Sequence, residues 1–158
     1  MIHLDELDCL ALLADFSVVW VPQAVWSEVE SHRPSALARK DVQIVRCSAT
    51  PSPRIHALAM IHTLHAGERE ALEVCSEHPG AVLLTDDTAA RLAAKTLGIR
   101  AHGTLGILLR AIRRSQKTSA EVVCLLGEIP DKSTLHVRPN LLDDIIRLAG
   151  DAKPEQES

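Results

Sequence analysis

The stretch AGEREALEVCSEHPGAVLLTDD, residues 66–87, predicts a helix followed directly by a buried strand. Apolar residues recur at helical spacing as far as Cys75, and the His-Pro-Gly sequence at 78–80 ends the helix. The apolar run 81–85 then has the length and composition of a short strand that is buried on both faces.

Acidic residues stand at both ends of this helix and strand. Glu68 lies in the first helical turn, and Asp86 and Asp87 follow the strand. A helix of about ten residues and a strand of about five cover similar distances in opposite directions, roughly 15 and 17 Å, so these acids return to one edge of the fold. Open parallel sheets bind ligands at that edge, and carboxylates without Cys or His beside them suit Mg²⁺ or Mn²⁺. Alternatively, Glu68 and Glu70 only favour the positive end of a helix, and Asp87 caps the next one.

The remaining pattern alternates helices with strands, which predicts a parallel sheet with right-handed crossovers. Helices are expected at 2–14, 23–31, 54–65, 88–97, 105–115, 118–128 and 140–149, and strands at 16–21, 41–47, 81–85 and 99–102. Asn140 is expected to cap the last helix and Gly150 to end it. We expect one domain over residues 1–150 and a disordered tail over 151–158.

Composition narrows the classes of protein to consider. The chain has only three aromatic residues, too few for a base-stacking platform, and its net charge of −4 argues against a dedicated duplex-binding surface. It contains no P-loop, dinucleotide-binding or nucleophile-elbow motif. The four cysteines form no metal or redox motif and are interpreted as small core residues in a reducing compartment. No signal peptide or membrane span is visible, so we expect a cytoplasmic protein without a membrane partner.

A third acidic position completes a set that could do chemistry. Glu28 lies about two turns into the helix after the first strand, near the edge that carries Glu68 and Asp86. Divalent-metal-dependent hydrolysis of a phosphodiester requires such a set, because the carboxylates hold the one or two metal ions.

Four segments in order resemble the PIN-like domain, in particular its prokaryotic branch with a strand-end DD and a G-T-L-G turn. They are VPQAVWSEVE at 21–30, AGEREALEV at 66–74, LLTDDTAARLAAKTLGI at 83–99 and HGTLGILLRA at 102–111. The resemblance covers residues 2–150. It implies an α/β fold, a three-layer α/β/α sandwich around a short parallel sheet, and Mg²⁺- or Mn²⁺-dependent cleavage of RNA. Many such proteins are the toxin of a toxin–antitoxin pair, which implies an antitoxin protein as a partner and leaves a homodimer open.

The resemblance also assigns roles to particular residues. Glu28, Glu68 and Asp86 match the family's second, third and fourth acids and would be catalytic metal ligands. Asp87 is a further candidate metal ligand, and Glu70 is a neighbour that could replace Glu68.

One departure from the family concerns its first strand, which ends in an Asp or Asn. This chain starts inside the run that follows that strand, and Asp5 and Asp8 fall on the first helix. We therefore expect the first strand and first acid to be missing, through a start site assigned too far downstream or through truncation. In the second case the chain is a catalytically inactive remnant that binds nucleic acid or protein. A flavodoxin- or receiver-like domain is a third interpretation, although its acids would follow the first strand.

Overall fold

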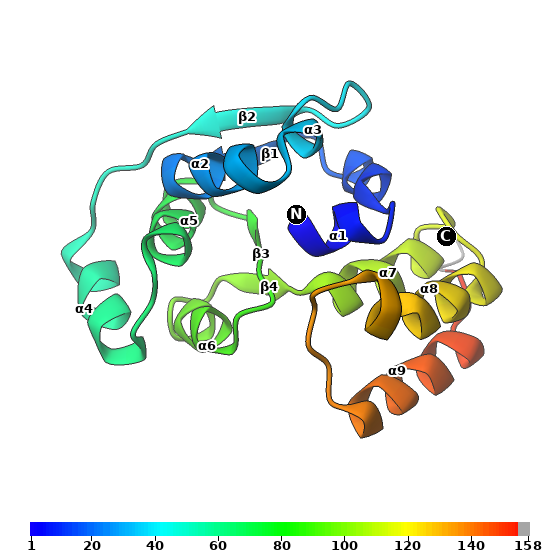
Figure 1. Ribbon diagram of the computed structural model, residues 1–158. Coiled ribbons are helices and arrows are strands. Elements are labelled where there is room, and N and C mark those ends of the chain that lie inside the picture. Colours follow the sequence, from blue (N-terminus) through cyan, green and yellow to red (C-terminus); the bar gives the residue numbers. More distant parts are fainter. Residues whose placement is uncertain (155–158) are drawn as a thin grey trace. The chain divides into compact units, whose positions relative to one another are not determined.

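The chain folds into two compact units in a computed structural model that describes residues 1–154 (Figure 1). The α/β unit comprises Leu13–Gly103, and the helical unit comprises Met1–Leu12 and residues 104–154. The prediction of a single domain over residues 1–150 stays a prediction. Of the predicted disordered tail, residue 151 belongs to the last helix, and residues 155–158 lie outside the described residues.

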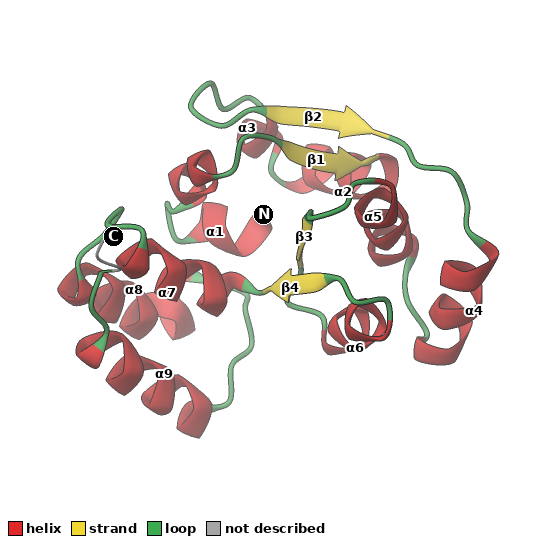
Figure 2. Cartoon of the chain, turned by 180° about the vertical axis from the view of Figure 1, so that it is seen from behind, coloured by secondary structure: helices red, strands yellow, loops and turns green. Residues whose placement is uncertain are grey.

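The four strands of residues 1–154 all belong to the α/β unit, which confirms the predicted fold class. They are β1 (Val19–Pro22), β2 (Ile44–Cys47), β3 (Val82–Leu84) and β4 (Arg100–His102). They are shorter than predicted and form two parallel pairs, β1 with β2 and β3 with β4 (Figure 2). Within residues 1–154 no strand is hydrogen-bonded between β1 and β3, so the single sheet expected for this fold is divided.

Helix α5 contacts both strand pairs of the α/β unit. The helices of this unit are α2 (Gln23–His32), α3 (Pro34–Leu37), α4 (Pro53–His62), α5 (Ala66–Glu77) and α6 (Thr88–Thr96). Helix α5 packs against β1 and β3, and its buried Leu72 joins a core cluster with Leu83 of β3 and Ala93 of α6. A second link is a stacked pair of rings 4.1 Å apart, Trp20 of β1 and His78 after α5.

The helical unit contains α1 (Ile2–Glu6), α7 (Thr104–Arg113), α8 (Ser119–Lys132) and α9 (Pro139–Asp151). Helix α8 packs against α7 and α9, and a capping box between Thr118 and Glu121 closes its first turn. The predicted cap of α9 is wrong: Arg138 is the N-cap residue and Asn140 lies inside the helix. Pro139 explains the shift, because its fixed φ suits the first helical position. No helix among the described residues is long and apolar enough to cross a membrane.

The prediction of one helix over residues 2–14 is wrong. Helix α1 ends at Glu6, and a separate 3-10 helix, η1, covers Leu10–Asp15. Between them Asp8 adopts the left-handed conformation, with φ of 54°, and the amide of Cys9 donates to the carbonyl of Leu4. The turn still buries the leucines of this segment, because burial depends on which way each side chain faces and not on an unbroken helix.

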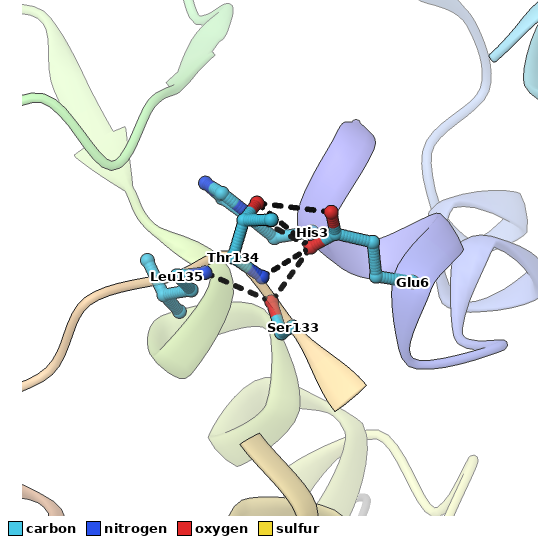
Figure 3. A network of polar contacts seen from close by, with 5 residues as sticks. All are labelled: His3, Glu6, Ser133, Thr134 and Leu135. Carbon is cyan, nitrogen blue, oxygen red and sulfur yellow. Dashed lines mark hydrogen bonds and ion pairs between the residues drawn. The ribbon is translucent and has the colours of Figure 1, made fainter. Parts of the chain in front are cut away.

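The carboxylate of Glu6 links α1 to the segment after α8 through hydrogen bonds. It accepts hydrogen bonds from the Ser133 hydroxyl and from the backbone amide and hydroxyl of Thr134, and it lies 3.2 Å from Nδ1 of His3 (Figure 3). Burial alone would raise the pKa of Glu6, but these hydrogen bonds outweigh it and lower the pKa to about 2. The carboxylate is therefore stabilised in its charged form.

The cysteines only partly match their interpretation as core residues. Cys9 is buried, Cys47 and Cys75 are half-buried, and Cys124 is exposed, so the prediction is wrong for Cys124. Burial raises the pKa of the Cys75 thiol to about 11, which keeps it protonated and unreactive at neutral pH.

Candidate active site

A cavity of about 290 Å³ opens at the carboxyl end of β3, within the α/β unit. It is lined by Val25, Glu28, His65, Gly67, Glu68, Ala71, Leu83, Leu84, Thr85 and Ala90. The start of α5 and the end of β3 thus share one cavity. This is the arrangement that the lengths of the helix and the strand predicted.

Helix α5 meets α2 closely at the cavity because residue 67 has no side chain. A Cβ on Gly67 would lie 3.0 Å from Cγ2 of Val25, which is closer than ordinary packing. One turn further on, Oε2 of Glu70 accepts a hydrogen bond of 2.8 Å from the backbone amide of Ala24. Helix α2 has no side-chain cap of its own, so Glu70 satisfies one of its first amides. Glu70, two residues after Glu68, thus has a structural role: it caps α2 and not its own helix α5.

Glu28 and Glu68 bring two carboxylates to the cavity. Glu28 is exposed, whereas Glu68 is partly buried and its Oε2 is a buried atom with no hydrogen-bond partner among the described residues. A buried carboxylate oxygen without a donor is costly, by about 1 to 3 kcal/mol or more. A cation at this place would remove that cost.

Asp86 follows the cavity-lining Thr85 but does not itself line the cavity. Its position depends on Gly103, the first glycine of the predicted turn before α7, because a Cβ there would lie only 2.6 Å from Oδ1 of Asp86. The G-T-L-G sequence predicts that Gly103 is a turn residue, but no local signal indicates its contact with Asp86. Only the fold brings residues 86 and 103 together, through the pairing of β3 with β4.

Asp87 caps the next helix, as the alternative interpretation predicted. Its Oδ1 accepts a hydrogen bond of 2.6 Å from the amide of Ala90, in the first turn of α6. Its role as a metal ligand stays a prediction.

Replacement of Asp87 tests its capping role. We expect Asp87→Ala to lower the free energy of unfolding by about 1 kcal/mol, and Asp87→Asn to change it little, because asparagine also caps helices well. Urea unfolding measures both. If Asp87→Asn were as destabilised as Asp87→Ala, the hydrogen bond to Ala90 would not account for the presence of this residue.

The donor set fits a divalent cation in part. Two carboxylates in one cavity, one with an unpartnered oxygen, are the hard ligands that Mg²⁺ and Mn²⁺ prefer. Within residues 1–154, however, no three His, Cys, Asp or Glu side chains are grouped closely enough to hold a metal ion. The structure therefore brings Glu28 and Glu68 to one cavity and does not join Asp86 to them.

These features define an α/β protein with a carboxylate-lined cavity at the carboxyl end of a parallel strand. The model of family DUF3368, a PIN domain, matches residues 1–151, and the chain belongs to this family. The match confirms the resemblance found in the sequence, and proteins with this domain are generally nucleases. Neither the curated proteins nor the solved structures gave a match.

Proposed function

We propose that this chain is a divalent-metal-dependent endoribonuclease of the cytoplasm. The observation that carries the proposal is the cavity that holds Glu28 and Glu68, with its buried and unpartnered Oε2 of Glu68. Membership of the PIN domain family supports the same reading, since proteins with this domain are generally nucleases.

Mg²⁺ or Mn²⁺ would be held by Glu28 and Glu68 together with Asp86, and Asp87 is a fourth candidate. When bound, such an ion supplies a Lewis acid and lowers the pKa of water at phosphate. Glu68 contributes a carboxylate from the first turn of α5. Gly103 leaves room for the carboxylate of Asp86 next to Thr85. Glu70 and Asp87 hold the first turns of α2 and α6 in place.

Cleavage of a labelled single-stranded RNA tests the proposal directly. We expect fragments in the presence of Mn²⁺ or Mg²⁺ and intact RNA when EDTA replaces the metal, because the carboxylates alone cannot stabilise charge on phosphorus. Mass spectrometry of the products would identify the bond that is cut. Intact RNA under all metal conditions would contradict the proposal.

A second function is favoured by a specific observation, the lack of a three-ligand metal group among the described residues. In that case the chain is a catalytically inactive PIN domain that binds nucleic acid or protein. RNA that is bound but never cut would support this function over the first.

The biological role we propose is that of the toxin in a toxin–antitoxin pair. Its partners would then be an RNA substrate and an antitoxin protein, and the active form could be a monomer or a homodimer. Growth arrest on expression, relieved by a protein encoded next to this one, would support that role.

A further inference from the structure

An arginine lies at the edge of the candidate active site, and no contact within the described fold explains its presence. Arg91 lies in α6 directly after Ala90, which lines the cavity, and it is exposed. Its guanidinium forms no hydrogen bond or ion pair within residues 1–154, whereas the guanidinium groups of Arg39, Arg46, Arg100 and Arg147 each donate a hydrogen bond to another residue there. Arg91 is therefore a cation that the described fold does not use.

Gly103 shows how near this cation comes to the acidic residues. The position that a Cβ on Gly103 would take lies 2.6 Å from Oδ1 of Asp86 and 3.4 Å from Nη2 of Arg91. The carboxylate and the guanidinium thus border the same small space, which only a glycine leaves open. A negative and a positive group of the chain therefore lie near each other at the end of β3 without forming an ion pair.

A positive group close to the acids reduces the repulsion between an acidic site and a negatively charged substrate. A phosphodiester carries a negative charge, and Glu28, Glu68 and Asp86 repel it at short range. A guanidinium beside these acids offsets the repulsion, and its planar fork can donate two parallel hydrogen bonds to phosphate oxygens. The first turn of α6 holds this group while keeping it accessible to solvent.

We infer that Arg91 binds a phosphate group of the nucleic-acid substrate at the edge of the cavity, and that Gly103 keeps the space beside it free. This inference rests on the proposed function and adds the residue that orients the backbone of the substrate. Arg91 contacts the substrate in this assignment and Gly103 is a positioning residue.

Binding of RNA without cleavage tests the inference. The probe is a short fluorescein-labelled single-stranded RNA in EDTA, and fluorescence anisotropy gives its affinity over a range of salt concentrations. We expect Arg91→Ala to weaken binding about tenfold, because a hydrogen-bonded charge is lost, and to reduce the slope of log affinity against log salt by about 0.7. The affinity of Arg91→Lys should lie between those of wild type and Arg91→Ala, since lysine keeps the positive charge but cannot donate two parallel hydrogen bonds.

Lys95 supplies the matched control, because it is an exposed cation on the same helix, one turn further from the end of β3. Lys95→Ala removes the same charge and should change affinity by less than twofold. Equal losses in Arg91→Ala and Lys95→Ala, or no loss in Arg91→Ala, would overturn the inference. Circular dichroism and thermal unfolding confirm that each variant folds.

The inference and the proposed function fail separately. If the wild-type chain binds RNA through Arg91 and never cleaves it, the nuclease proposal fails and the phosphate contact stands. If it cleaves RNA and Arg91→Ala binds as tightly as wild type, only the inference fails. A wild-type chain that binds no RNA overturns the inference as well.

Discussion

Glu68→Gln should lower the rate of Mn²⁺-dependent RNA cleavage by at least about 100-fold. The substitution keeps the size of the side chain and removes the charge from the one carboxylate in the cavity that has a buried, unpartnered oxygen. Loss of a metal ligand weakens the charge stabilisation that the ion supplies, and each 1.36 kcal/mol of barrier is worth tenfold in rate. Gel analysis of cleaved RNA under single-turnover conditions measures the effect.

A second measurement makes this prediction independent of activity. Metal that binds the folded chain raises its melting temperature, so Mn²⁺ should stabilise wild type and leave Glu68→Gln unchanged. Glu70→Gln is the matched control on the same helix. It should keep most of the cleavage and the Mn²⁺ effect while losing about 1 kcal/mol of stability, because Glu70 caps α2. The reverse result, with Glu70 essential and Glu68 dispensable, would show that Glu70 and not Glu68 is the metal ligand.

Glu6→Gln should cost on the order of 3 kcal/mol of stability at neutral pH. Glu6 is 5% exposed, and its pKa falls from 4.5 to about 2 in the folded chain, which at 1.36 kcal/mol per unit gives a contribution of this size. Because the folded pKa is lowered, this stability is fully present above about pH 4.5 and disappears as the pH falls towards 2. Urea unfolding between pH 2 and pH 7 measures it.

The curves of wild type and Glu6→Gln should therefore converge as the pH approaches 2. Asp8→Asn is the matched control, since Asp8 is an exposed acid in the same segment and asparagine also tolerates its left-handed backbone. That variant should follow the wild-type curve. Two curves for wild type and Glu6→Gln that stay parallel down to pH 2 would mean that Ser133 and Thr134 do not stabilise the charge of Glu6.

Much of the α/β unit could be predicted because its signals are local. The spacing of apolar residues and the His-Pro-Gly terminator predict the helix at 66–77 and the strand at 82–84. The lengths of this helix and strand place Glu68 near Thr85. The capping role of Asp87 follows from its position before an alanine-rich helix. These features need no knowledge of distant parts of the chain.

What could not be predicted depends on residues far apart in the sequence. Glu70 caps a helix 46 residues earlier, and Glu6 bonds to residues more than 120 positions later, so their roles appear only once the chain is folded. The helix break at Asp8 could not be predicted, because no glycine or proline stands at that position. The position of Asp86 could not be predicted for the same reason, since it depends on tertiary packing around Gly103.

The division of the strands into two parallel pairs has a consequence for how the protein behaves among copies of itself. Within residues 1–154, β1 and β3 each pair with one strand only, and an unpaired strand edge is a template on which another chain can add and aggregate. An exposed strand must be long enough to pair stably with a strand of another chain. At three or four residues each, these strands are too brief to recruit a neighbour, so their shortness protects the protein from polymerising through its own sheets.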